Sequence, residues 1–231
     1  IEGKNDEGVR GSQAFLDLAM HPPIIDLVEQ LIGPNIVLWG CHVFCKPASE
    51  GYETPWHQDG HYWPIRPLAT CTVWVALDPS TRANGCLRVI PGSNKGKHLH
   101  PHLHEDRTDL TLNQRMADGA FEESQAMDLE LEPGQMSMHD VYMIHGAKAN
   151  TSGQRRTGVA LRYMPASSHF DRSLKPVDLL ARQLKALAQQ TGIDTAQVSD
   201  AIFGCVTQTA DQGANIGKLA LVRAGWSDQV P

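Results

Sequence analysis

The sequence has little of what marks secreted, membrane-spanning or nucleic-acid-binding proteins. Its 231 residues include only five cysteines. An odd count in apolar stretches argues against a disulfide framework, and we expect buried, reduced thiols. No apolar run approaches the ~20 residues of a membrane span. The formal net charge is −6, which favours neither nucleic acid nor an anionic membrane as a partner. These absences predict a cytoplasmic globular protein.

The chain also lacks an initiator methionine, a signal peptide and a C-terminal targeting signal. It begins at Ile1, so we expect the natural N-terminus to be missing, with any targeting segment that it carried. The sequence contains no internal repeat and no composition shift that would mark a second domain. We therefore predict one domain over residues 1–231.

The spacing of apolar residues predicts a mainly β protein with helices at both ends. Short strands with frequent turns are typical of a β-sandwich or barrel. Residues 36–46 are apolar at both parities, so both faces of that strand should be covered. The polar stretch 96–126, with alternating histidines, is predicted to be a solvated loop that closes in part over a site. The predicted strands are 36–46, 70–77, 86–90, 127–131, 136–138, 142–145, 155–164 and 218–223, and the predicted helices are 12–20, 23–32, 177–190 and 194–202.

The motif His57-Gln58-Asp59, combined with the distant His145, indicates a metal site. His57 and Asp59 are two residues apart, so on a strand both side chains would point to one face. Two imidazoles and one carboxylate occupy one face of an octahedral metal and leave three positions open, as in non-heme Fe(II) oxygenases. Arg156 starts a predicted strand downstream, and its planar guanidinium can pair with the far carboxylate of 2-oxoglutarate.

Segments well beyond these ligands make the chain resemble the phytanoyl-CoA dioxygenase family over roughly residues 24–165. The resemblance implies the fold of that family, a double-stranded β-helix (jelly roll, cupin-like) with flanking α-helices. The core would then cover about residues 35–165, with a helical, C-terminal extension at 166–231. The segments that carry the resemblance are Gly33-Pro34-Asn35-Ile36, His57-Gln58-Asp59 with His61-Tyr62 and Pro64, Arg66-Pro67, Trp74, Asn84-Gly85-Cys86-Leu87, Pro91-Gly92-Ser93, His145-Gly146 and Asn150 to Arg156.

The resemblance also implies roles for individual residues. The iron ligands would be His57, Asp59 and His145, and Arg156 would pair with the distal carboxylate of 2-oxoglutarate. The cosubstrate would further be bordered by Trp74, His42, Gln58 and, at a poorly aligned position, Lys4. Ala147 stands where many members have a serine, so one hydrogen bond to the cosubstrate is missing or comes from another residue.

The residues that follow the ligand motif are candidates for shaping the substrate pocket: His61, Tyr62, Trp63 and Arg66. The aromatic cluster among them is equally explained as a hydrophobic plug. Arg66 would pair with an anionic substrate, or else be a surface or structural arginine. The sequence names neither the substrate nor the oligomeric state.

The activity implied is that of an Fe(II)- and 2-oxoglutarate-dependent dioxygenase. With O2, and with ascorbate as reductant in vitro, it would oxidise an unactivated C–H bond of a small molecule and release succinate and CO2. Because Asp59 is present, hydroxylation, desaturation or ring closure is favoured over halogenation, whose enzymes in this family lack the carboxylate. Two alternatives stay open: a cupin-like enzyme that uses another metal for isomerisation or hydrolysis, and a catalytically silent binding protein of the same fold.

Overall fold

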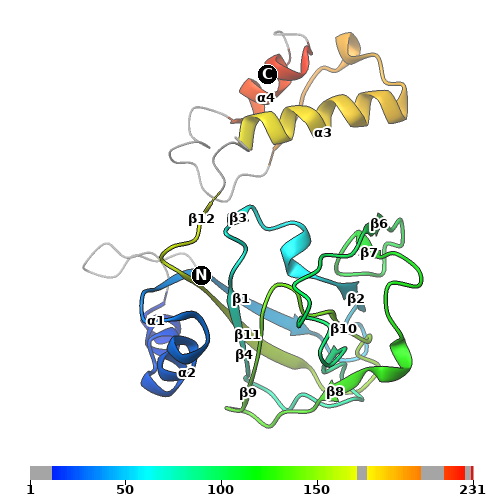
Figure 1. Cartoon of the computed structure of the whole chain (residues 1–231). Coiled ribbons are helices and arrows are strands. Elements are labelled where there is room, and N and C mark those ends of the chain that lie inside the picture. Colours follow the sequence, from blue (N-terminus) through cyan, green and yellow to red (C-terminus); the bar gives the residue numbers. More distant parts are fainter. Residues whose placement is uncertain (1–11, 171–175, 204–215, 227–229, 231) are drawn as a thin grey trace. The chain divides into compact units, whose positions relative to one another are not determined.

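The computed structural model describes residues 12–170, 176–203, 216–226 and 230 (Figure 1). The chain divides into two compact units, residues 1–170 and 171–231, and each is described by itself. The first unit is built mainly from antiparallel strands and the second from helices, which confirms the prediction of a mainly β fold with flanking helices. No helix in the described part of the chain is long and apolar enough to cross a membrane.

The elements of the first unit, in chain order, are α1 (Gln13–Ala19), α2 (Pro22–Ile32), β1 (Ile36–Lys46), β2 (Thr54–His57), the 3-10 turn η1 (Asp59–His61), β3 (Ile65–Arg66), β4 (Cys71–Ala76), β5 (Leu87–Val89), β6 (His102–His104), β7 (Gln114–Met116), η2 (Glu123–Gln125), β8 (Met127–Leu129), β9 (Met136–His139), β10 (His145–Ala147), β11 (Arg156–Pro165) and β12 (His169–Phe170). The second unit contains α3 (Pro176–Thr191), the 3-10 turn η3 (Thr195–Gln197) and α4 (Ile216–Ala224).

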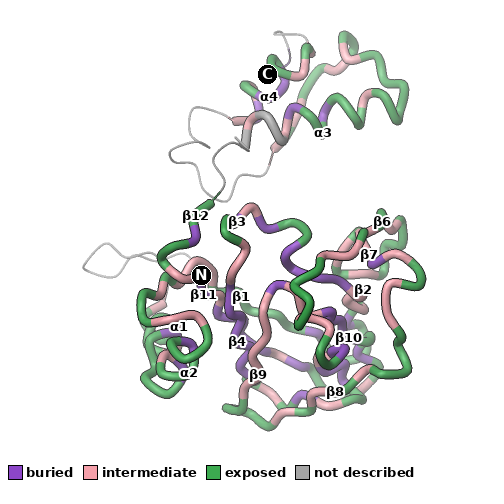
Figure 2. Tube along the Cα trace, viewed as in Figure 1, coloured by how far each residue is buried: buried purple, intermediate pink, exposed green. Residues whose placement is uncertain are grey.

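Two four-stranded sheets form the framework of the first unit, and two small two-stranded sheets, β12-β3 and β6-β7, accompany them. One large sheet has the order β1-β11-β4-β9, and the other has the order β2-β10-β5-β8. Figure 2 shows that buried residues concentrate along strands such as β4 and β10. Every residue of β4 is buried, as its largely apolar, β-branched sequence predicts for an interior strand.

The alternation of side chains on β11 divides its residues between two environments. Val159, Leu161 and Tyr163 face the main apolar core, which also contains residues of α1 and α2. The hydroxyl of the buried Tyr163 donates a hydrogen bond to the carbonyl of Ala19, at 2.7 Å, and so ties α1 to the sheet. The even-numbered residues of β11, which include Arg156 and Arg162, point to the opposite face of the sheet.

The two N-terminal helices lie where the sequence predicts them. Pro22 opens α2 at a position where the missing N–H costs nothing, and Gly33 ends it with a φ of 88°. Buried Ile24 and Val28, one helical turn apart, pack into the core. Ser12 is the N-cap residue of α1, but its side chain makes no capping hydrogen bond.

The prediction that both faces of residues 36–46 are covered is wrong. β1 lies at an edge of its sheet, and residues 41–45 are exposed. In the first part of the strand, the side chains of Ile36 and Leu38 pack against the main apolar core, which also contains residues of α1 and α2. Cys41 and Cys45 are consequently exposed, contrary to expectation, whereas Cys71 and Cys86 are buried thiols as predicted. Cys205 lies outside the described residues.

Four other predictions of local structure need correction. Residues 218–223 belong to helix α4, because Gly217, Ala220 and Leu221 are buried at helical spacing. Residues 194–202 contain only the turn η3. The stretch 96–126 is not a featureless loop: β6 and β7 pair in it as a hairpin, with His102 opposite Met116. The strand expected over 142–145 begins only at His145.

Candidate active site

Two adjacent strands bring the two candidate histidine ligands together. His57 ends β2, His145 begins β10, and the two residues are direct partners in the antiparallel register. The side-chain donor atoms of His57, Asp59 and His145 all lie within 4.8 Å of one another, and the three residues are 5%, 3% and 6% exposed. Donor atoms this close, on buried side chains, can share one metal ion.

Asp59 reaches this cluster by a route that the sequence did not predict. It is the first residue of η1 rather than a member of strand β2. The turn after His57 still brings its Oδ1 to 3.6 Å from His57 Nε2. The hydroxyl of Tyr62 donates a hydrogen bond of 2.7 Å to the same Oδ1, which helps to orient the carboxylate.

Backbone carbonyls set the tautomer of both imidazoles. His57 Nδ1 lies 2.8 Å from the carbonyl oxygen of Pro55, and His145 Nδ1 lies 2.9 Å from that of Met143. A carbonyl only accepts hydrogen bonds, so Nδ1 carries the proton in each ring. The lone pair is left on Nε2, the atom free to bind a metal, and the Nδ1 hydrogen bond orients the ring.

The protonation states of the cluster suit metal binding. Burial lowers the pKa of His145 well below its ordinary value, and the neighbouring His57 lowers it further. Burial alone would raise the pKa of Asp59, but the adjacent His57 outweighs burial and lowers the pKa. A neutral imidazole and an ionised carboxylate are the forms that coordinate a divalent ion.

Gln58, between two of the candidate ligands, is completely buried and holds the turn in place. Its amide nitrogen donates to the carbonyls of His98 and Tyr142, and its amide oxygen accepts from the backbone N–H of His100. The backbone N–H of Gln58 donates to His102 Nε2. Burial lowers the pKa of His102 to about 4, which keeps this ring a neutral acceptor. The segment that was expected to be solvated therefore positions the three candidate ligands.

Arg156 is a buried cation without an anionic partner among the described residues. It is 5% exposed, and its guanidinium lies 5.2 Å from the ring centroid of Trp74. One Nη donates to the carbonyl of Gly85 at 2.8 Å, while Nε has no hydrogen-bond partner. Burial lowers the pKa of Arg156 to about 10, so it remains charged at neutral pH. A buried, unpaired charge is costly, and an anionic ligand would offset that cost.

Gly158 makes room for the indole on which Arg156 rests. A Cβ at this position would lie 2.1 Å from Trp74 Cζ2, closer than any real contact. We therefore expect Gly158→Ala to displace Trp74 and, with it, the guanidinium of Arg156. The affinity of this variant for 2-oxoglutarate, measured by titration calorimetry, should be at least tenfold lower than that of the wild type.

Gly153→Ala is the matched control for this variant, because a Cβ at Gly153 meets nothing within 4 Å. Equal affinity of the Gly158→Ala protein and the wild type for 2-oxoglutarate would show that the Trp74 position is irrelevant to the cosubstrate.

Comparison with known proteins identifies the family of this site. The family model described as phytanoyl-CoA dioxygenase (PhyH) matches residues 1–158. The chain belongs to the phytanoyl-CoA dioxygenase family. The resemblance read from its sequence motifs is thereby confirmed.

Individual members and structures of related fold agree with this assignment. Peroxisomal phytanoyl-CoA dioxygenase of Homo sapiens is 34% identical over 157 residues, which are 64% of this chain and 45% of that protein. The non-heme monooxygenase ThoJ, in its apo form, has a TM-score of 0.59 at 29% identity and covers 67% of this chain and 56% of its own. The epimerase SnoN, in complex with Fe3+, alpha ketoglutarate and nogalamycin RO, has a TM-score of 0.56 at 28% identity. The match covers 69% of this chain and 62% of the SnoN chain. The chain spans about half the length of the curated family members that it matches.

The other residues singled out from the sequence are distributed around the cluster. Trp63 is buried in a small core with Ile65, which fits the reading of a hydrophobic plug, while Tyr62 and His61 are exposed. His61 stacks on His102, with ring centroids 4.1 Å apart. Arg66 is exposed and donates to the backbone carbonyl of Ile65, as expected of a structural arginine.

Three further residues were singled out from the sequence as neighbours of the cosubstrate. His42 is exposed rather than buried, and its Nδ1 accepts a hydrogen bond of 2.8 Å from Arg162. Ala147 is buried in β10, two residues after His145. Lys4 lies outside the described residues.

Sequence reasoning missed several polar groups that face the space beside the cluster. The ring of His139 packs at a tilt against that of His145, with ring centroids 4.7 Å apart. The buried Nδ1 of His139 has no hydrogen-bond partner. The hydroxyls of Thr72 and Ser137 are also buried and unpaired. Thr72 is opposite His139 in the register of β4 and β9, and Ser137 is opposite Trp74. The parity of Trp74 on the predicted strand 70–77 would have placed Thr72 on this face.

Lys46 was likewise missed. It is buried next to Arg156 in the register of β1 and β11. Its Nζ donates to the backbone carbonyls of Tyr52 and Lys148. Burial, and secondarily the charge of Arg156, lowers its pKa to about 7. Two cationic side chains therefore lie at the same end of this sheet.

Proposed function

We propose that the protein is an Fe(II)- and 2-oxoglutarate-dependent oxygenase that oxidises a C–H bond of a small molecule. The iron would be held by Nε2 of His57, Nε2 of His145 and the carboxylate of Asp59. The observation that carries the proposal is the cluster itself, three buried donor atoms within 4.8 Å, with Nδ1 of both imidazoles already committed to carbonyls. Membership of the phytanoyl-CoA dioxygenase family supports it.

The donor set fits iron by its chemistry. Two neutral nitrogens and one carboxylate oxygen suit a divalent first-row metal, and three ligands leave room for exogenous ones. Iron and 2-oxoglutarate, when bound with O2, supply an oxidant strong enough to attack an unactivated C–H bond, with release of succinate and CO2. All other contributions come from the protein.

Arg156 would bind the far carboxylate of 2-oxoglutarate, with its unpaired Nε–H as one donor. The indole of Trp74 would form the wall against which the cosubstrate chain lies, since its ring packs under the Arg156 guanidinium. Tyr62 would keep the Asp59 carboxylate oriented while substrates exchange, because its hydroxyl bonds that carboxylate from the exposed side. The buried hydroxyls of Thr72 and Ser137 supply hydrogen-bonding groups on the same face.

An assay without the natural substrate tests this proposal. Many oxygenases of this type consume 2-oxoglutarate slowly when the substrate is absent, so we expect succinate to form from Fe(II), ascorbate and 2-oxoglutarate under air. Formation should stop when a chelator removes the metal. If the protein neither forms succinate nor binds 2-oxoglutarate in the presence of Mn(II), the oxygenase assignment is wrong, and the cupin-like or binding-protein alternatives take its place.

A further inference from the structure

A second uncompensated guanidinium lies on the same face of β11, six residues from Arg156. Arg162 is half-buried, and within the part of the chain that the structure describes it has no acidic partner. Its one hydrogen bond is donated to His42 Nδ1, at 2.8 Å. Three aromatic rings surround it: its Cζ lies 4.9 Å from the ring centroid of Trp63 and 5.8 Å from those of Trp39 and Phe44. These rings stabilise the cation but offer no hydrogen-bond acceptor in the plane of the guanidinium.

Two unpaired N–H donors meet at this place. Nε of Arg162 and Nε1 of Trp39 are both buried and have no hydrogen-bond partner. The Trp39 ring is held edge-on against Trp63, with centroids 4.7 Å apart, so the indole is fixed rather than free to seek another acceptor. A cation with one unsatisfied donor of its own, next to an indole with another, calls for a group that only accepts hydrogen bonds and carries negative charge. A carboxylate or a phosphoryl group has those properties.

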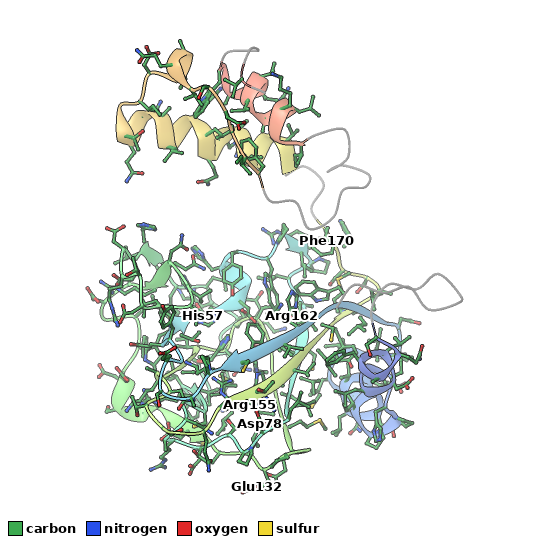
Figure 3. The ribbon with its side chains drawn as sticks, turned by 180° about the vertical axis from the view of Figure 1, so that it is seen from behind. His57, Asp78, Glu132, Arg155, Arg162 and Phe170 are labelled. Carbon is green, nitrogen blue, oxygen red and sulfur yellow. The ribbon has the colours of Figure 1, made fainter. Side chains whose placement is uncertain are left out.

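Two aromatic side chains, Tyr62 and Trp63, connect this site to the candidate metal ligands. Tyr62 hydrogen-bonds the Asp59 carboxylate, its ring centroid lies 6.2 Å from that of Trp63, and Trp63 packs against Arg162. Figure 3 shows Arg155, the neighbour of Arg156, beside Asp78. Six residues of extended strand span roughly 20 Å.

We propose that Arg162, together with Trp39 and Trp63, binds the anionic group of the substrate, and that the substrate is an organic acid carrying a carboxylate or phosphoryl group. This inference rests on the proposed function, since it assigns the substrate class of the same active site. It moves the role of anion recognition from Arg66, which is committed to backbone carbonyls, to Arg162. His42 and Phe44, which lie beside it, are exposed.

The test uses small aromatic probes and the full chain loaded with Mn(II) and 2-oxoglutarate. Benzoate and phenyl phosphate present the two kinds of anion, and benzamide is the neutral counterpart. We expect at least one anion to bind the wild type at least tenfold more tightly than benzamide, as measured by titration calorimetry. Arg162→Met keeps the length and apolar contacts of the side chain, and it should abolish this preference. Arg162→Lys should retain part of it, and Trp39→Phe, which loses one donor, should weaken anion binding about fivefold.

Arg66→Met is the matched control and should behave as the wild type. The inference is overturned if the anions bind the wild type no better than benzamide, or if Arg162→Met and Arg162→Lys retain the full preference. Loss of anion binding in Arg156→Met but not in Arg162→Met would also overturn it, because the probe would then occupy the cosubstrate site.

Titration of 2-oxoglutarate into the same samples separates this inference from the proposed function. If the wild type fails to bind 2-oxoglutarate while benzoate binding still depends on Arg162, the oxygenase assignment fails and the anion site stands. If 2-oxoglutarate binds normally and no anion depends on Arg162, only the substrate class is refuted.

Discussion

Replacing Asp59 with alanine is expected to lower 2-oxoglutarate-dependent succinate formation by more than about 100-fold. Loss of a residue that merely orients a metal ligand costs 10- to 100-fold in metal affinity or activity, so loss of a ligand should cost more. Asp59 is the only carboxylate in the cluster of three buried donors. Without it, two neutral imidazoles face a divalent ion with no compensating charge. His57→Ala should have the same effect.

The fold should survive these changes. Asp59 occupies a turn rather than the apolar core, and the hydrogen bonds of Gln58 that anchor this turn remain intact in the variant. Circular dichroism and thermal unfolding without metal should therefore resemble those of the wild type. Asp17→Ala is a suitable control, since Asp17 is an exposed residue of α1 whose carboxylate accepts a hydrogen bond from Gln13. Near-wild-type succinate formation by Asp59→Ala would refute the assignment of this carboxylate as a ligand.

Replacing Arg156 with methionine is expected to raise the KM for 2-oxoglutarate at least 30-fold. Removing one partner of a buried, hydrogen-bonded charge pair costs about 2 to 5 kcal/mol, and each 1.4 kcal/mol is about a factor of ten. The effect should fall mainly on KM, because Arg156 would hold the far end of the cosubstrate rather than the reacting atoms. Succinate formation at saturating 2-oxoglutarate should change much less.

Arg156→Met should weaken cosubstrate binding, but it should not destabilise the free protein. In the absence of 2-oxoglutarate, the buried guanidinium is paired only with a carbonyl and an aromatic face. Substituting an apolar side chain of similar length removes a desolvation penalty, so the melting temperature of the free protein should stay the same or rise. Added 2-oxoglutarate and Mn(II) should raise the melting temperature of the wild type, but barely that of Arg156→Met.

Arg155 provides the matched control for this arginine. It is adjacent in the chain, but it points to solvent and pairs with Asp78. Arg155→Met should leave the KM for 2-oxoglutarate unchanged. If Arg156→Met also leaves it unchanged, or if both variants raise it equally, the cosubstrate carboxylate binds elsewhere.

The parts of the fold that could be predicted from sequence are those with local signals. The strand 70–77 is rich in apolar and β-branched residues, and the helix 23–32 has a proline at its start and a glycine after its end. The convergence of His57 with His145 could not be deduced from spacing, because it depends on the antiparallel pairing of β2 with β10 across 88 residues. Motif resemblance, rather than periodicity, indicated that pairing.

The errors share a physical origin in tertiary context. The apolar run 36–46 does not reveal that helices α1 and α2 cover only its first part. The run Lys-Leu-Ala-Leu-Val-Arg is short enough to suit a strand or a helix, and packing in the second unit makes it helical. The contacts of Gln58 could not be predicted either, because its amide hydrogen-bonds distant backbone groups whose proximity no local pattern records.

The most direct test of this account is a crystal structure of the protein with Mn(II) and 2-oxoglutarate, grown without oxygen. We expect one metal ion bound by Nε2 of His57, Nε2 of His145 and the carboxylate of Asp59. The far carboxylate of 2-oxoglutarate should lie against the guanidinium of Arg156, beside Trp74. A metal ion bound by other residues, or a cosubstrate whose far carboxylate avoids Arg156, would contradict the account.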